Sequence, residues 1–115
     1  MTEVRLRPEA EQDLLEAALW YEANEPGLGG QFLDQVQATL AALADQPAAY
    51  AVVHNSVRRA LVRRFPFGVF YMIEDDGALV VAIYMTVDTL GPGDSALDGS
   101  RKNLRFKHLH RLESR

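Results

Sequence analysis

The sequence predicts an α+β domain in which a helical hairpin packs on a small, antiparallel-rich sheet, followed by an irregular C-terminal tail. Three observations support this fold class. A short alternating segment comes first, and two stretches with apolar residues at helical spacing follow it. The remaining body consists of apolar runs bounded by turn residues, which is typical of strands. The predicted order is therefore β-α-α-β-β-β, with helices and strands segregated along the chain.

The N-terminal part is expected to form a strand and then a helix. Val4 and Leu6 alternate with charged residues, as in a strand with one buried face. Pro8 suits the first turn of a helix, where its missing N–H is not needed. The helical stripe that follows contains Ala10, Leu14, Ala17, Ala18 and Tyr21. Trp20 extends this stripe, and we expect Trp20 and Tyr21 both to pack in the core.

A second helix is expected after a turn. Residues 25–30 read Glu-Pro-Gly-Leu-Gly-Gly and break the first helix. The apolar stripe of the second helix contains Phe32, Val36, Leu40 and Leu43. Pro47 ends this helix, and the short loop predicts that the two helices lie antiparallel. Residues 48–56 are expected to form a loop, with Tyr50 packed back on the hairpin.

The rest of the body is expected to be strand. Residues 57–64 lead through Phe-Pro into a second strand over residues 67–74. Asp-Asp-Gly at 75–77 is a hairpin signal that introduces a strand over residues 78–84. This last run is continuously apolar, which is typical of a strand covered on both faces.

Composition sets broad bounds on the protein. The chain has 115 residues, is 48% apolar and 24% charged, and has a net charge of -4, values that are ordinary for one globular domain. The absence of cysteine excludes disulfides and thiolate-bound metals. The N-terminus does not resemble a signal peptide, and no apolar run is long enough to span a bilayer. We therefore expect a cytoplasmic protein with no membrane partner.

Several short motifs follow one another in a familiar order. Their sequences are Leu14…Trp20-Tyr21-Glu22, Pro26-Gly27-Leu28-Gly29…Phe32, Pro47…Tyr50 and Val57-Arg58-Arg59…Arg64-Phe65-Pro66-Phe67…Phe70-Tyr71. In order and spacing the chain resembles the RelE/ParE toxins of type II toxin–antitoxin systems over about residues 2–84. The resemblance implies a small cytoplasmic toxin that a cognate antitoxin neutralises. RelE-like members cut messenger RNA on the ribosome, whereas ParE-like members inhibit DNA gyrase.

One position favours the ParE-like branch. RelE-like nucleases resemble a Gly-Tyr-Arg-Leu-Val-Tyr pattern at the strand that begins near residue 67, and this chain has Gly68 where the arginine would stand. RNA cleavage requires cations that stabilise the charge developing on the phosphorus centre. The resemblance therefore implies a toxin that binds DNA gyrase and is not an enzyme. The alternatives are a RelE-like ribosome-dependent mRNA endonuclease (an mRNA interferase), or a degenerate remnant that binds antitoxin alone.

Four arginines within seven residues reverse the overall charge of the chain locally. They are Arg58, Arg59, Arg63 and Arg64. On a continuous strand, Arg59 and Arg63 would share one face and Arg58 and Arg64 the other. One interpretation is that a pair holds antitoxin carboxylates or a phosphate backbone through bidentate hydrogen bonds. The other is that these arginines pair with acidic residues of the first helix, for which the candidates are Glu9, Asp13 and Glu16.

No catalytic residue, cofactor site or metal site is predicted. Tyr71 lies at mid-strand among apolar residues and is expected to be a core residue, not a general acid or base. His54 has no second ligand nearby, and no phosphate-binding glycine loop precedes a helix.

The segment 85–115 departs from the family resemblance. Members of this branch typically end in a basic His-x-Arg-Arg-x-Pro-x-x-Trp-x-x-Arg segment, whereas residues 85–96 are neutral to acidic and rich in turn formers. Read one base out of step from the third base of the Tyr84 codon, the codons permit His-Asp-Arg-Arg-His-Pro-Arg-Thr-Trp-Arg-Gln-Arg. We infer a toxin domain over 1–84 and a frameshifted, loop-rich tail over 85–115. The alternative is a coincidental fit, because the third bases are unseen.

This inference has a functional consequence. A chain without the basic ending is expected to fold but to be weakly toxic or inactive. Sequencing the gene tests the frameshift directly.

Overall fold

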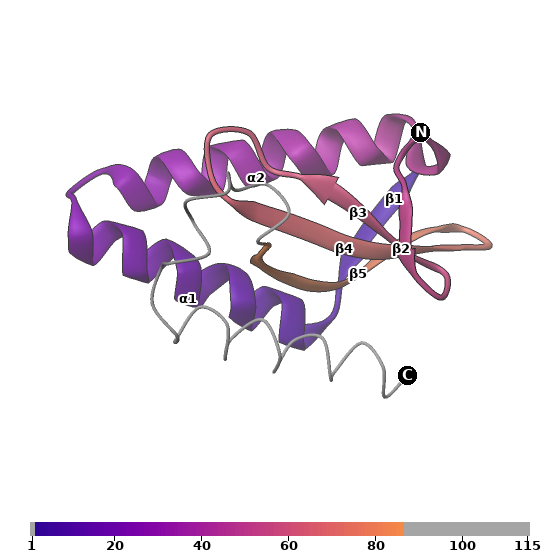
Figure 1. Cartoon of the computed structure of the whole chain (residues 1–115), viewed down its shortest axis with the longest axis horizontal. Helices are drawn as coiled ribbons and strands as arrows, with labels where there is room; N and C mark the ends of the chain where they lie inside the picture. The colour runs from indigo at the N-terminus through magenta and orange to yellow at the C-terminus, as the bar shows by residue number, and fades with distance from the viewer. Residues whose placement is uncertain (1, 87–115) are drawn as a thin grey trace.

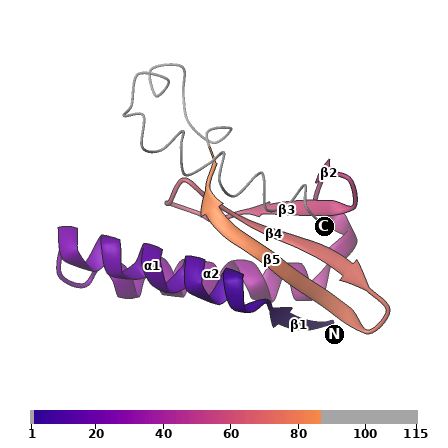
Figure 2. The same ribbon diagram turned by 90° about the horizontal axis from the view of Figure 1, so that it is seen from below.

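The computed structural model describes residues 2–86, which form two helices packed on a five-stranded sheet. The elements in chain order are β1 (Glu3–Leu6), α1 (Pro8–Asn24), α2 (Leu28–Asp45), the 3₁₀ turn η1 (Pro47–Ala49), β2 (Val52–His54), β3 (Val57–Leu61), β4 (Phe67–Glu74) and β5 (Gly77–Met85). Both helices lie on one side of the sheet (Figures 1 and 2). The predicted α+β fold class with its helical hairpin is confirmed.

The strand order in the sheet is β1-β5-β4-β3-β2. β1 runs parallel to β5, and the other neighbours are antiparallel, so the sheet is mixed but antiparallel-rich. The central strands β4 and β5 pair along their whole length. The parallel edge strand brings the beginning of the chain beside its last described strand.

The prediction of a loop over residues 48–56 is wrong in one part, because Val52–His54 forms the edge strand β2. Its pairing with β3 is irregular, and Val52 and Val53 are both exposed. A strand so short and with neither face buried shows no apolar alternation, which is the signal that sequence patterns rely on. Asn55 makes the turn into β3 with a φ of 51°, a conformation that asparagine tolerates better than most residues.

The strand predicted over residues 57–64 is shorter than expected, because β3 ends at Leu61. The Val62 N–H donates a hydrogen bond to the Phe67 carbonyl across a distance of 2.9 Å, and this bond closes a turn around residues 63–66. Arg64 lies in this turn with a φ of 72°. The sequence predicts that Arg63 and Arg64 lie on opposite faces of a strand. This prediction is wrong, since both residues belong to the turn.

An aromatic cluster joins the helices to the sheet. Phe32 of α2 is fully buried, and the centroid of its ring lies 5.2 Å from that of Tyr21, 5.2 Å from that of Phe65 and 5.0 Å from that of Phe67. The expectation that Tyr21 is a core residue is confirmed. Trp20 is 54% exposed, so the same expectation is wrong for Trp20. One residue along a helix turns a side chain by about 100°, which moves Trp20 off the buried stripe.

β5 is buried on both faces and contains a β-bulge. Phe70 pairs with Ala82 but Tyr71 pairs with Val80, so Val81 is an extra residue on β5. Ala78, Val80 and Ile83 belong to the helix-side core. A second apolar cluster lies on the opposite side of the sheet, here called the far face, and consists of Val57, Phe70, Val81, Ala82 and Tyr84. Because both faces of β5 pack in apolar clusters, the strand reads as a continuous apolar run, and the bulge determines which residues belong to which cluster.

No helix in the described part of the chain is both long and apolar enough to cross a membrane. The prediction of a frameshifted, loop-rich tail over residues 85–115 falls mostly on residues 87–115, which lie outside the described residues. Met85 is the last residue of β5, and the Thr86 N–H donates to the Pro66 carbonyl at 3.0 Å.

Candidate partner-binding surface

Arg58 holds a connecting segment against the sheet. Its guanidinium donates to the carbonyl oxygens of Tyr50 at 2.6 Å and Ala48 at 3.2 Å. Tyr71, which pairs with Arg58 across the strands, donates its hydroxyl to the Pro47 carbonyl at 2.6 Å. These bonds tie residues 47–50 to strands β3 and β4. The geometry therefore gives Arg58 a structural role.

Tyr71 is a core residue, as the sequence predicts, and has no solvent exposure. Burial raises the pKa of Tyr71 above its ordinary value of 10.0; the charge of Arg58 acts in the opposite direction, and Tyr50 raises it further. A phenol with a raised pKa whose proton is already donated to a carbonyl is a poor general base near neutral pH.

Arg59 lies on the far face beside a pair of stacked rings. It is the cross-strand partner of Phe70, whose ring stacks on that of Tyr84 with centroids 4.3 Å apart and planes at 11°. The Arg59 guanidinium lies 3.5 Å from the Thr86 hydroxyl oxygen. Phe70 and Tyr84 are 4% and 5% exposed, so the two rings are packed in the far-face cluster with Arg59 beside them.

The backbone at Gly68 lies directly under these side chains. A Cβ at this position would meet the Phe70 ring at 3.0 Å and Cγ of Arg59 at 3.2 Å. The space above Gly68 is therefore already occupied by its two neighbours on the far face. A long side chain at position 68 would require both of them to move.

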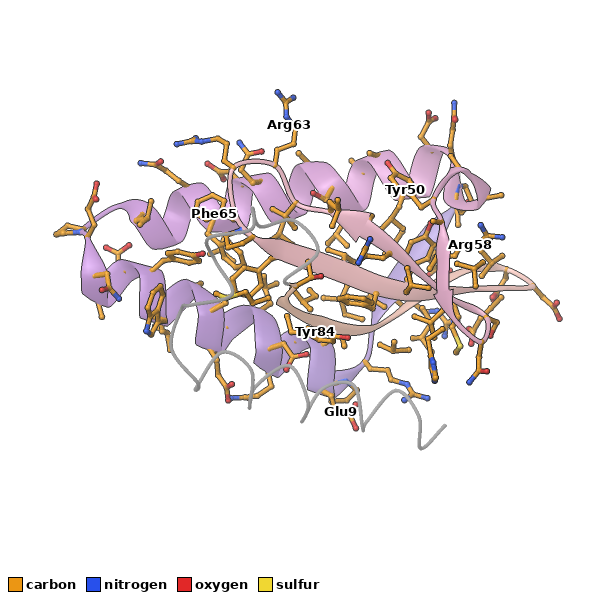
Figure 3. All side chains as sticks on the ribbon, in the orientation of Figure 1. Glu9, Tyr50, Arg58, Arg63, Phe65 and Tyr84 are labelled. Carbon is orange, nitrogen blue, oxygen red and sulfur yellow. The ribbon has the colours of Figure 1, made fainter. Side chains whose placement is uncertain are left out.

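Arg63 and Arg64 lie in the turn between β3 and β4. Arg63 is exposed and points away from the body, far from Arg58 (Figure 3). Arg64 donates to the Gln31 side-chain carbonyl at 3.2 Å, and its guanidinium carbon lies 6.0 Å from the centroid of the Phe65 ring. The turn thus presents two cations at the end of the sheet that lies over the beginning of α2.

The four arginines consequently occupy three places, not one patch. Among residues 2–86 the ion pairs join Arg5 to Glu74 at 2.6 Å and to Asp76 at 3.8 Å. Pairing of Arg58, Arg63 and Arg64 with Glu9 or Glu16 is not found there. The expectation of an electrostatic match with the first helix is thus wrong for those residues, while partner binding by the arginines stays a prediction.

The two buried rings beside Arg59, those of Phe70 and Tyr84, were not among the sequence-based candidates. In the sequence both read as ordinary core positions of apolar strands. Their stacking depends on the extra residue at Val81, and a β-bulge has no reliable sequence signal.

The described residues contain no group of three His, Cys, Asp or Glu side chains that could hold a metal ion. His54, on β2, has the side-chain amide of its neighbour Asn55 at 3.3 Å.

Comparison with known proteins assigns the fold and the family. The structure is similar to a chain from the chromosomal ParDE TA system of P. aeruginosa, with a TM-score of 0.65 and 18% sequence identity, over 75% of this chain and 97% of that chain. At this identity the likeness concerns the fold. None of the curated proteins matches the sequence. Residues 4–86 match the family described as ParE toxin of type II toxin-antitoxin system, parDE, and the chain therefore belongs to the ParE toxin family.

Proposed function

We propose that this ParE-family toxin acts by binding DNA gyrase, not by cutting RNA, and that a cognate antitoxin binds and neutralises it. Its place of action would then be the cytoplasm, where gyrase and chromosomal DNA are found. The observation that carries the choice between binding and catalysis is the far face around Gly68.

A ribonuclease site requires several charged groups around the scissile phosphate. Cations must stabilise the developing charge, and a group of suitable pKa must move a proton. Among residues 2–86, two arginines of the strands lie on the far face. They are Arg59 on β3 and, at the opposite edge of the sheet, Arg5 on β1, which is ion-paired with Glu74. Between them lie the apolar side chains of the far-face cluster. Phe70 and Tyr84 of this cluster are only 4% and 5% exposed, so the far face of the described residues has one cation beside a packed apolar cluster. That is too little charge for a ribonuclease site, which supports binding over catalysis.

The antitoxin would contact the cations at the β3–β4 turn and the far-face edge. Arg63 and Arg64 are exposed, and an arginine can bind a carboxylate through two parallel hydrogen bonds. Arg59 lies on the far face near the same end of the sheet. Arg58 is left out of this surface, because its guanidinium already donates to two backbone carbonyls.

The test compares this chain with a second version whose ending is restored by a single-base correction. Each purified protein is added to a gyrase supercoiling reaction and, separately, to a translation reaction in which mRNA cleavage is mapped. We expect the restored version to inhibit supercoiling, the present chain to inhibit it less, and neither to cleave mRNA. Ribosome-dependent cleavage without inhibition of gyrase would replace this proposal by the RelE-like alternative. Activity in neither reaction, with retained antitoxin binding, would identify a remnant.

A further inference from the structure

Arg64, in the β3–β4 turn, has a backbone conformation that favours other residue types. Its φ is 72°, in the left-handed region that glycine, asparagine and aspartate enter more readily than residues with long side chains. Within residues 2–86 the other non-glycine residue with a positive φ is Asn55, and asparagine suits such a turn. Arginine at position 64 is therefore expected to make the folded chain less stable than asparagine would.

The surroundings of Arg64 keep its backbone in this conformation. The Phe65 side chain is buried in the core, and the Phe67 N–H donates to the Phe65 carbonyl at 2.8 Å. The Thr86 N–H donates to the Pro66 carbonyl at 3.0 Å. Arg64 could not reach a negative φ without disturbing these contacts, because they fix the chain directly after it. The strain is thus held in place by the rest of the fold.

The contacts of Arg64 within residues 2–86 do not account for an arginine at this position. Its guanidinium donates to the Gln31 side-chain carbonyl at 3.2 Å in an exposed contact, and the guanidinium carbon lies 6.0 Å from the centroid of the Phe65 ring. The first is a single solvent-exposed hydrogen bond, and the second lies at the outer limit of a cation–π contact. The ion pairs found among these residues do not include Arg64. A strained residue that the fold does not require points to a binding function.

We infer that Arg64, oriented by Gln31, is the anchor for a carboxylate of an acidic peptide segment on a protein partner. Its bond to Gln31 uses one N–H of Nη2, and the other N–H groups suffice to bind a carboxylate through two parallel hydrogen bonds. Arg63, exposed at the preceding position, adds positive charge. The inference rests on the antitoxin contact proposed above, and it assigns that contact an anchor residue, a ligand group and a cost in stability.

The charge around the β3–β4 turn favours a peptide carboxylate over the phosphates of a nucleic acid. Residues 8–45, which include Gln31, contain no Lys, Arg or His. At the beginning of α2 the N–H groups of Gly27 and Gly29 are bonded to the Glu22 carboxylate, so this helix end supplies no further donor from those two residues. A DNA duplex carries one charge per about 1.7 Å of its axis and would bring several phosphates against this acidic hairpin. A peptide can present a single carboxylate to the turn, with neutral residues beside it.

The test uses the isotope-labelled full chain and a short peptide of alternating glutamate and alanine, titrated at low salt and followed by NMR. The same peptide with glutamine in place of glutamate is the charge control, and a short DNA duplex represents phosphate. Arg64→Asn removes the charge and suits the backbone conformation, whereas Arg63→Asn removes the same charge from the neighbouring residue. Asn55→Gly changes the other residue of positive φ without changing charge. Thermal unfolding of each variant is measured in parallel.

We expect the glutamate peptide to shift the NMR signals of the β3–β4 turn and of the Arg64 side chain, and the glutamine peptide to shift neither. Arg64→Asn should weaken peptide binding about tenfold while raising the melting temperature by about 2–5 °C. Arg63→Asn should weaken binding less and should not raise the melting temperature. Asn55→Gly should leave binding unchanged.

Equal peptide affinity for Arg64→Asn and the unaltered chain would overturn the inference. So would a lower melting temperature for Arg64→Asn, an equal loss of binding in Asn55→Gly, or tighter binding of the DNA duplex than of the peptide at the turn. These outcomes do not depend on gyrase. The supercoiling reaction tests the proposed function separately, and a negative result there is distinguishable from a peptide that does not bind.

Discussion

The two faces of the sheet differ in how their side chains pack. On the helix side, Phe32 and Tyr21 interlock with rings from the β3–β4 connection and β4, so each ring is fixed by several others. On the far face, a stacked ring pair lies beside Arg59 and over a glycine. The difference teaches that the helix side carries the larger core, whereas the far face combines a smaller buried cluster with a charged side chain. Substitutions on the two faces should accordingly affect different measurements.

The largest effect is expected for Phe32→Ala. The ring is fully buried, and its removal leaves a cavity among three other rings, so the free energy of unfolding should fall by about 3–5 kcal/mol. Urea unfolding followed by circular dichroism measures the loss. The control is Leu33→Ala at the next position, where the side chain is partly exposed and a much smaller loss is expected. Similar losses for both variants would contradict the assignment of Phe32 to the core.

The next effect separates two adjacent arginines. Arg58→Ala removes hydrogen bonds from a charged donor to two carbonyls, so the free energy of unfolding should fall by about 1–3 kcal/mol. Arg59→Ala should cost less stability but weaken binding to antitoxin or gyrase more. Denaturation and a binding assay on both variants test this crossed pattern. If Arg58→Ala proved to be the variant that loses binding while remaining stable, the division of roles would be reversed.

A smaller effect is expected at the turn between the helices. The Glu22 carboxylate accepts the N–H of Gly27 at 2.9 Å and of Gly29 at 3.0 Å, so it caps the beginning of α2. Glu22→Ala should lower the free energy of unfolding by about 1–2 kcal/mol. Glu25→Ala, an exposed carboxylate in the same turn, is the matched control and should change stability little. Identical unfolding curves for Glu22→Ala and Glu25→Ala would show that the Glu22 cap does not stabilise the protein.

The smallest effect depends on pH. The folded-state pKa of Tyr71 lies above the ordinary value of 10.0, so its neutral phenol stabilises the folded protein fully below about pH 10. This contribution is lost as the pH rises through the folded-state pKa. Tyr71→Phe should cost about 1 kcal/mol at neutral pH by removing the bond to Pro47, and should make stability fall less steeply above pH 10. Identical alkaline slopes in the two proteins would exclude this role for Tyr71.

The regions that the sequence predicts well are those with a periodic buried face. The helix stripes led by Phe32 and Tyr21 repeat over several turns, and burial against the sheet enforces that repeat. Trp20 was misplaced because a bulky residue next to such a stripe resembles a member of it. β2 escaped detection because it is short and has neither face buried.

The candidate surface was harder to predict than the fold. The placement of Arg63 and Arg64 depends on where β3 ends, and a turn closed by a hydrogen bond from Val62 to Phe67 fixes that end. The stacking of Phe70 on Tyr84 depends on the bulge at Val81. The end of β3 and the bulge in β5 each depend on the position of a single residue, which tertiary contacts determine. A periodic sequence pattern therefore does not predict them.

The parallel pairing of β1 with β5 also governs how this protein can fold during its own synthesis. Glu3 pairs with Gly77 and Leu6 with Val80, and a Cβ at Gly77 would collide with the Glu3 carbonyl. β1 can therefore pair with β5 only after nearly the whole domain has left the ribosome. Contacts between such distant parts of a chain form slowly. The five-stranded sheet is therefore completed only after β5 has left the ribosome, so a shorter nascent chain holds the helical hairpin without its parallel edge pairing.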